Sequence, residues 1–309
     1  MFENMKIVAV EPIGISAERA KEIQSQLAQK GHEFVWYGDR KEDAATLVER
    51  MQDAEIVIVS NIPLPVEVLS KCPKLQFLNV AFTGLDHIDL GYCEAHHIRV
   101  KNASGYATEG VAELAVGLMI DVLRQITRLD GSIRECGIRG AFLGRELRGK
   151  TVGIVGTGAI GIRTAQLLQA FGCEVIAWSR TQRPEVTGMG IPYVSLEDLM
   201  RRSDIVSLHV PMTPETNGLI SRELLALCKP TAILINTARG KVVDMNALAD
   251  ALRNGRMAGA GIDVYEKEPP LPQDHPLLNA PNCVLVPHVG YATREAFDDR
   301  IEIVLRNLE

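Results

Sequence analysis

Three side chains in the last third of the chain stand out because each follows a short apolar run. Arg239 comes just after the run 232–236, Glu268 lies a few residues beyond the run 259–263, and His288 follows the run 283–286. If these runs are neighbouring parallel strands, the three side chains share the carboxyl edge of one sheet, where such folds bind ligands. The sequence therefore predicts one site built from three separate segments.

The types of these side chains indicate what the site could do. A guanidinium holds an anion with a forked set of donors, and an imidazole gives or takes a proton near neutral pH. A carboxylate beside the imidazole orients it and favours its protonated form. Each type alone is usually structural or solvated, so the prediction rests on their joint occurrence, in this order, behind a nucleotide-binding loop.

That loop is the G-x-G-x-x-G segment 156–161, which is a weak signal by itself. Here it directly follows the strand-like run GKTVGIV and precedes a segment with helical spacing of apolar residues. The glycines permit a tight turn, close approach of the backbone to a pyrophosphate, and close helix–strand packing, and the helix N-terminus attracts phosphate. We therefore predict dinucleotide contacts at Gly156, Gly158, Ala159, Ile160 and Gly161.

The choice of dinucleotide depends on the end of the next strand-like run, CEVIAW. It ends in Ser179 and Arg180, where an acid commonly holds the ribose 2′-hydroxyl of NAD. A hydroxyl and a guanidinium suit a 2′-phosphate instead. We expect NADP(H), with NAD(H) as the alternative if Arg180 only stacks on the adenine or points into solvent.

Composition excludes several classes of function. The chain has 309 residues, 46% hydrophobic and 23% charged, with a formal net charge of −6. This indicates a globular protein and argues against a general nucleic-acid partner. The six cysteines form no C-x-x-C pair and no zinc-like spacing with histidine, so we expect reduced thiols and no metal. The longest apolar stretch, 110–123, carries Glu113 and Asp121, so we expect no membrane partner and a cytoplasmic location.

Apolar runs and helical segments alternate along the chain, which predicts βαβ units and parallel sheets. The predicted strands are Lys6–Val10, Phe34–Tyr37, Ile56–Ser60, Leu75–Val80, Ile98–Val100, Thr151–Val155, Cys173–Trp178, Ile205–Val210, Ala232–Asn236, Gly259–Asp263 and Cys283–Val286. The clearest predicted helices are Ser16–Lys30, one long helix over Thr108–Arg134, and Thr293–Leu308.

These elements predict an α/β fold with two doubly wound parallel-sheet domains. We expect a Rossmann-type dinucleotide-binding domain over residues 102–289, inserted in a flavodoxin-like substrate-binding domain made of residues 1–101 and 290–309. The last helix is thus expected to return to the first domain.

Several segments, in the same order, resemble the D-isomer-specific 2-hydroxyacid dehydrogenase family over nearly the whole chain. They are LRGKTVGIVGTGAIG, LHVPMTPETNGLI, INTARGKVVD, GIDVYEKEPP and VPHVGYAT. The resemblance implies transfer of a hydride between NAD(P)H and a small 2-oxo or 2-hydroxy acid. It implies a catalytic set of Arg239, Glu268 and His288, in which the arginine binds carboxylate and carbonyl and the histidine moves the proton.

The same resemblance implies roles for further residues. Asp263 is expected at the nicotinamide carboxamide, and the segment 80–89 matches the family's substrate loop. Phe82 stands where glycine is frequent in that loop, so it is expected to shape the pocket. The implied cofactor contacts are His209, Pro211, Thr216, Thr237, Ala238, Asp263 and His288, and the implied substrate contacts are Phe82, Thr83, Gly84 and Arg239.

Assembly and substrate are expectations from the same resemblance. The helix over 111–123 and the region 142–147 resemble the family's dimer arm, so we expect a homodimer. Glyoxylate or hydroxypyruvate is favoured as substrate, with D-3-phosphoglycerate dehydrogenase activity as the nearest alternative. A dinucleotide-sensing binding protein on the same fold is the alternative from another class, but it leaves the catalytic set without a purpose.

Overall fold

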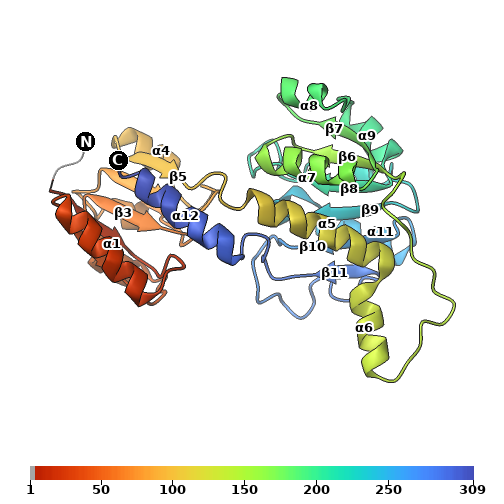
Figure 1. The fold of residues 1–309 in the computed structure, drawn as a ribbon, viewed down its shortest axis with the longest axis horizontal. Coiled ribbons are helices and arrows are strands. Elements are labelled where there is room, and N and C mark those ends of the chain that lie inside the picture. The colour runs from red at the N-terminus through yellow and green to blue at the C-terminus, as the bar shows by residue number, and fades with distance from the viewer. Residues whose placement is uncertain (1–3) are drawn as a thin grey trace. The chain divides into compact units, whose positions relative to one another are not determined.

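The computed structural model describes residues 4–309 and divides into two compact units (Figure 1). Unit 1 comprises Met1–Ala107 and Ala292–Glu309, and unit 2 comprises Thr108–Tyr291. The expected boundary after residue 101 falls inside strand β5 (Arg99–Asn102), which pairs with its neighbour in the sheet of unit 1. Unit 1 therefore continues past the expected boundary.

Unit 1 is built on a five-stranded parallel sheet. Its strands are β1 (Lys6–Ala9), β2 (Glu33–Trp36), β3 (Ile56–Val59), β4 (Phe77–Val80) and β5. They pair in the order β2-β1-β3-β4-β5, which is the flavodoxin-like order that we predicted. Strands β3 and β4 are buried along their whole length, as central parallel strands require.

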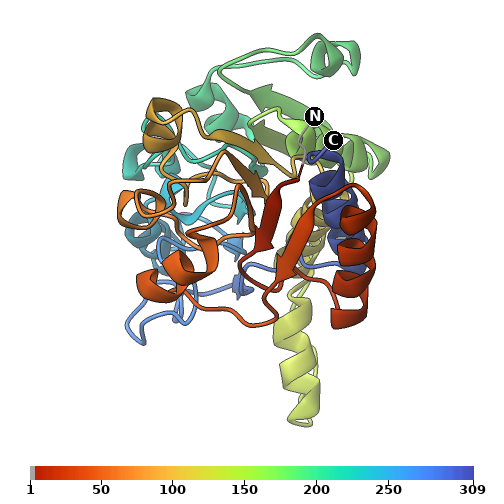
Figure 2. The same cartoon turned by 90° about the vertical axis from the view of Figure 1, so that its left-hand side faces the viewer.

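Five helices accompany this sheet in the described part of the chain: α1 (Ala17–Gln29), α2 (Ala44–Met51), α3 (Val66–Leu69), α4 (Leu90–Ala95) and α12 (Arg294–Arg306). Helix α1 begins after Ser16, whose side chain caps the N–H of Arg19. Helix α12 returns to unit 1 and lies beside α1, where Arg19 pairs with Glu302 at 3.0 Å (Figure 2).

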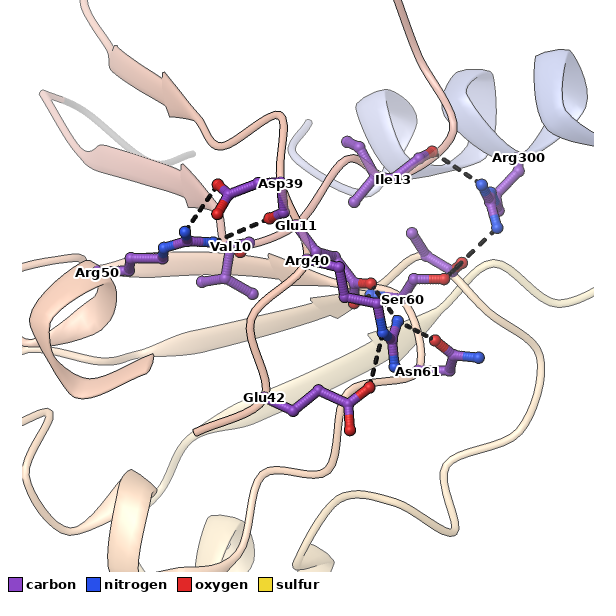
Figure 3. Close-up of polar contacts among 11 residues, drawn as sticks. Val10, Glu11, Ile13, Asp39, Arg40, Glu42, Arg50, Ser60, Asn61 and Arg300 are labelled. Atoms are coloured by element: carbon purple, nitrogen blue, oxygen red, sulfur yellow. Dashed lines mark hydrogen bonds and ion pairs between the residues drawn. The ribbon is translucent and has the colours of Figure 1, made fainter. Parts of the chain in front are cut away.

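Buried charges tie together the loops at the carboxyl edge of this sheet (Figure 3). Glu11, after β1, accepts hydrogen bonds at 2.7 Å from the Ser60 N–H and from Arg40. Arg50 donates to the Val10 carbonyl at 2.7 Å, and Arg300 donates to the Ile13 carbonyl at 2.8 Å. Because a buried charge is costly unless it is paired, these contacts hold the loops in one arrangement.

Unit 2 contains a six-stranded parallel sheet. Its strands are β6 (Thr151–Val155), β7 (Glu174–Trp178), β8 (Ile205–Leu208), β9 (Ile233–Asn236), β10 (Gly259–Ile262) and β11 (Cys283–Leu285), in the order β11-β10-β9-β8-β6-β7. A single parallel bridge, Ala177 to Tyr193, extends the sheet beyond β7. With that bridge as a reduced third strand, the order at this end is that of a Rossmann fold.

Both faces of the second sheet are covered by helices, which confirms the prediction of doubly wound domains. The helices are α5 (Thr108–Arg124), α7 (Ala159–Ala170), α8 (Pro184–Gly188), α9 (Leu196–Arg202), α10 (Arg222–Leu225) and α11 (Met245–Arg253), with a short 3₁₀ turn at Gly240–Val242. One apolar core lies between the sheet and α5 and α7, and a second between the sheet and α9 and α11.

The prediction of one helix over Thr108–Arg134 is wrong. Helix α5 ends at Arg124, and a separate helix α6 (Ile126–Arg134) follows (Figure 1). Gln125 has a φ of 51°, which breaks the helical hydrogen-bond ladder, and Asp121 accepts the N–H of Thr127 at 2.9 Å across the break. Apolar spacing continues through the break, so the sequence pattern did not reveal it.

No helix within residues 4–309 combines the length and the apolar character that a membrane crossing requires. Over the same residues, no group of three or more His, Cys, Asp and Glu side chains is arranged to hold a metal ion.

Candidate active site

The glycine loop lies where β6 ends, between the ends of β7 and β8. Gly156 has a φ of 101°, and its N–H donates to the Trp178 carbonyl at 2.7 Å. A Cβ on Gly161 would lie 2.0 Å from the Gly156 carbonyl oxygen, so only glycine fits there. Helix α7 begins at Ala159 with Gly158 as a cap that offers no side chain, which leaves its first N–H groups for a ligand.

Two polar atoms near this loop are buried without a partner among residues 4–309: Nδ1 of His209 and Oγ1 of Thr237. His209 follows β8 and Thr237 follows β9, and these strands are neighbours. Buried polar groups are normally hydrogen-bonded, so such atoms at a strand edge indicate a ligand. Together with the glycine cradle, they fit a dinucleotide whose phosphates lie at the start of α7 and whose remaining part runs along the edge.

His209 is kept neutral in this place. Burial lowers the pKa of its imidazole to about 4, and its Nε2 pairs with the Ser207 hydroxyl at 2.9 Å. Thr216, farther along the loop after β8, donates to the Pro211 carbonyl at 2.6 Å and so shapes the loop that we expect on the adenosine side. A neutral ring adds no charge beside the expected cofactor.

Ser179 and Arg180 directly follow β7, as predicted, and Arg180 is exposed. Tyr193 links this region to the glycine loop, because its hydroxyl lies 2.8 Å from Thr157 Oγ1 and accepts the Arg183 N–H at 3.0 Å. The sequence analysis missed Tyr193. It lies in a strand reduced to one bridge, which leaves no apolar run to find.

Arg239 lies at the end of β9, in a turn organised by Asn236. The Asn236 side chain, fully buried, accepts the Ala238 N–H and donates to the Arg239 carbonyl, both at 3.0 Å. The next residue must be glycine, since a Cβ on Gly240 would lie 1.8 Å from the carbonyl carbon of Tyr265. The turn thus fixes the backbone position from which the Arg239 side chain extends.

His288 is held in an uncommon backbone conformation. Its φ is 54°, a region that residues other than glycine rarely adopt, and its N–H donates to the Asp263 carbonyl at 2.8 Å. The Asp263 carboxylate accepts the N–H groups of Val289 at 2.7 Å and Gly290 at 3.0 Å. A strained residue held by this many contacts indicates a functional position.

Asp263 therefore has a role that the sequence analysis missed. Both of its carboxylate oxygens are bonded to the backbone after His288. The expected contact of Asp263 with the nicotinamide carboxamide stays a prediction beside this supporting role. Burial raises the pKa of this carboxyl, and the two N–H donors and the nearby His288 oppose the rise. The signal was present in the sequence, because an acid directly after a buried strand faces the next strand's loop.

Glu268 meets His288, as the sequence predicted. Its Oε1 lies 3.2 Å from His288 Nδ1, and the Tyr291 ring packs edge-on against the imidazole at 5.4 Å. The contact with Glu268 is made by Nδ1, so we expect Nε2 to be the nitrogen that transfers the proton. Arg239, Asp263 and His288 follow three adjacent strands, and Glu268 contacts His288, so unit 2 carries the predicted catalytic set of Arg239, Glu268 and His288 on one edge of its sheet.

The predicted substrate contacts Phe82, Thr83 and Gly84 lie in unit 1, directly beyond β4. The Phe82 ring is buried and packs near the rings of His87 and Tyr106, with centroid distances of 6.4 and 6.5 Å. Within unit 1, these residues lie near the beginning of the loop 80–89 that the family resemblance indicated.

Comparison with known proteins defines the class. Residues 116–290 match the model of the D-isomer specific 2-hydroxyacid dehydrogenase family, NAD binding domain. A glyoxylate reductase of Thermococcus litoralis is 40% identical over 295 residues, covering 92% of this chain and 88% of that protein. A D-3-phosphoglycerate dehydrogenase of Mycobacterium bovis is 41% identical, and the chain covers 49% of its length.

Solved structures agree. The NADPH-dependent glyoxylate/hydroxypyruvate reductase of Sinorhizobium meliloti, in complex with NADP and malonate, is 33% identical, with a TM-score of 0.84 over 99% of this chain and 93% of that one. The chain belongs to the D-isomer-specific 2-hydroxyacid dehydrogenase family. It is therefore a nicotinamide-dependent oxidoreductase of the 2-hydroxyacid dehydrogenase type.

Proposed function

We propose that this chain reduces glyoxylate or hydroxypyruvate, with NADPH as the preferred hydride donor. The observation that carries the proposal is the Glu268–His288 pair, on the same sheet edge as Arg239 and the glycine loop. A nicotinamide cofactor held at this edge would supply the hydride for the carbonyl carbon of the acid. Side chains and backbone groups of the chain bind and orient the acid and transfer the proton.

Arg239 binds the substrate carboxylate and polarises the carbonyl with its forked donors. His288 gives the proton from Nε2 to the carbonyl oxygen as the hydride arrives, and the imidazole is then reprotonated from solvent. Glu268, on Nδ1, orients the ring, as the acid of a catalytic triad does. The product is the 2-hydroxy acid, and the reverse reaction uses the same groups.

An unphosphorylated substrate is favoured by the expected substrate loop. Residues 80–89 contain no lysine or arginine, whereas a phosphate group normally needs a cation beside it. The buried ring of Phe82 also favours a short acid. The identity to mycobacterial phosphoglycerate dehydrogenase keeps phosphohydroxypyruvate as the second candidate substrate.

The preference for NADPH is supported by the end of β7, where Ser179 and the exposed Arg180 stand in place of an acid. The double substitution Ser179→Asp with Arg180→Ile should move the ratio of kcat/KM values towards NADH. An unchanged ratio would show that these residues do not select the cofactor.

We also propose a cytoplasmic homodimer. The stretch 111–123, which we expected in a dimer arm, lies in helix α5 and packs mostly in the apolar core of unit 2, so it does not supply the surface of the dimer. Helix α6 projects from the rest of unit 2 (Figure 1). It buries none of its residues in this chain and leaves Ile126 and Ile133 exposed, and Ile138 and Leu143 are exposed in the segment after it. Such an apolar surface is typical of a contact with another protein. Light scattering should give the mass of a dimer, and Ile133→Asp with Ile138→Asp should shift it towards the monomer.

The test of the proposed activity is a set of initial rates for glyoxylate, hydroxypyruvate, pyruvate and phosphohydroxypyruvate, each with NADPH and NADH. Fast turnover of glyoxylate or hydroxypyruvate with NADPH is the expected result. Preference for phosphohydroxypyruvate would replace the proposal by the second candidate. Cofactor binding without turnover of any acid would favour the dinucleotide-sensing alternative.

A further inference from the structure

In the loop that follows β4 in unit 1, three consecutive backbone carbonyl groups accept hydrogen bonds from other segments of that unit. The Ala81 carbonyl accepts the Ser60 hydroxyl at 3.3 Å, the Phe82 carbonyl accepts the Ala103 N–H at 3.1 Å, and the Thr83 carbonyl accepts Asn102 Nδ2 at 2.6 Å. The shortest of these bonds, by far, comes from a side chain at the end of β5.

Holding a carbonyl also fixes the next N–H, because a trans peptide is planar and its N–H points opposite to its C=O. The Asn102 bond to the Thr83 carbonyl therefore directs the Gly84 N–H away from Asn102. In the same way, the Ala103 bond to the Phe82 carbonyl directs the Thr83 N–H. Among residues 4–309, no hydrogen bond has the N–H of Thr83 or Gly84 as its donor. Two successive N–H groups of this kind can bind an anion.

Asn102 is itself fixed. It lies opposite Val80 in the β4–β5 pair, and its carbonyl accepts Asn307 Nδ2 at 3.2 Å from the end of α12. Asn307 also donates to the buried Asn79 at 3.1 Å. Asn102 is therefore held by the sheet of unit 1 and by helix α12. The shape of the loop thus depends on contacts with residues outside the loop.

Ser60 is fixed in a similar way, but its bond to the loop is weaker. Its N–H donates to the buried Glu11 carboxylate at 2.7 Å, and Arg40 holds the other carboxylate oxygen (Figure 3). The hydroxyl bond to Ala81 is 3.3 Å long, which is beyond the usual range for a hydroxyl donor.

We propose that Asn102 is a positioning residue for substrate binding, because it aims the Gly84 N–H at the substrate carboxylate, with Ser60 as a weaker second support. This inference rests on the proposed function. Asn102 touches neither the substrate nor the cofactor. It acts through the peptide planes of a loop whose two N–H groups can bind a carboxylate.

The first test separates KM from kcat. Asn102→Ala should raise the KM for glyoxylate about three- to tenfold, the range that one lost hydrogen bond gives, and Ser60→Ala should raise it less. The kcat at saturating glyoxylate and the affinity for NADPH should each stay within about twofold of wild type, since the loop binds ground and transition states alike. Asn254→Ala and Ser25→Ala, whose side chains bond to exposed helix carbonyls, are matched controls.

The second test does not need turnover. Oxalate, a carboxylate that cannot be reduced, should slow hydrogen exchange of the Thr83 and Gly84 amides in wild-type protein loaded with NADPH, and protect them less in Asn102→Ala. Unchanged KM in Asn102→Ala, or no oxalate protection at these amides in wild type, would overturn the inference. If wild type reduces none of the four acids but oxalate protects both amides, and protects them less in Asn102→Ala, the proposed function fails and the positioning role stands.

Discussion

The buried imidazole of His209 leads to a prediction about stability against pH. Burial lowers its pKa from 6.5 to about 4 in the folded protein. The unfolded chain therefore binds a proton on this residue between those two values while the folded chain does not. The stabilisation is fully present above pH 6.5 and is lost as the pH falls towards 4.

The magnitude follows from the same difference in pKa. At about 1.4 kcal/mol for each pH unit, it amounts to up to about 3 kcal/mol of unfolding free energy. The residue as a whole is only half-buried, so this value is an upper limit. Replacing His209 by Gln keeps an amide near the Ser207 hydroxyl and removes the titration.

The assay is urea unfolding of both proteins at several pH values from 7.5 to 4. Carboxyl groups titrate in this range in both proteins. The contribution of His209 is therefore the difference between the unfolding free energies of wild type and His209→Gln at each pH. Wild type should lose about 2–3 kcal/mol more than His209→Gln over this range. Parallel curves would show that His209 is hydrated in the folded state and would refute the reasoning from burial.

Three further predictions concern the supports of the site. Asp263→Asn removes a charge-assisted bond behind His288 and should lower kcat/KM about ten- to hundredfold in initial-rate assays. Tyr193→Phe removes the hydroxyl that links Thr157 to the segment after Arg180, so it should weaken NADPH binding about three- to tenfold in a fluorescence titration. Gly240→Ala forces a Cβ into the backbone at Tyr265 and should cost about 3 kcal/mol or more in urea unfolding.

Each of these has a result that would contradict it. Unchanged kcat/KM in Asp263→Asn would mean that the loop of His288 holds its shape without the carboxylate. Tyr193→Phe with wild-type NADPH affinity would show that the two loops are fixed independently. Gly117→Ala is the matched control for Gly240→Ala, because its Cβ meets nothing within 4 Å and alanine is the better helix former. Equal stability of the two glycine variants would refute the steric argument.

The order of elements was predictable because buried parallel strands are continuous apolar runs. Strands such as Ile56–Val59 and Ile233–Asn236 are read directly from composition, and their alternation with helices fixes the class of fold. The short third strand at Tyr193 was not predictable in this way, since one bridge needs no apolar run. The break at Gln125 likewise depends on a single backbone angle.

For the site, the sequence could name the reacting side chains but not what holds them. The pair of Glu268 and His288 follows from residue type and order, and the structure places the two in contact. The bonds from Val289 and Gly290 to Asp263, and from Asn102 to Thr83, join segments that only the folded backbone brings together. No sequence motif marks hydrogen bonds of this kind.

The most direct test of the proposed mechanism is kcat/KM for glyoxylate with NADPH in wild type, His288→Ala and Glu268→Gln. We predict a loss of about 10²- to 10⁴-fold for His288→Ala, the range for removal of a general acid, and a smaller loss for Glu268→Gln with an altered pH profile. Cofactor affinity should remain near wild type in both variants. Near-wild-type turnover in His288→Ala would contradict the assignment of the proton donor and with it the proposed mechanism.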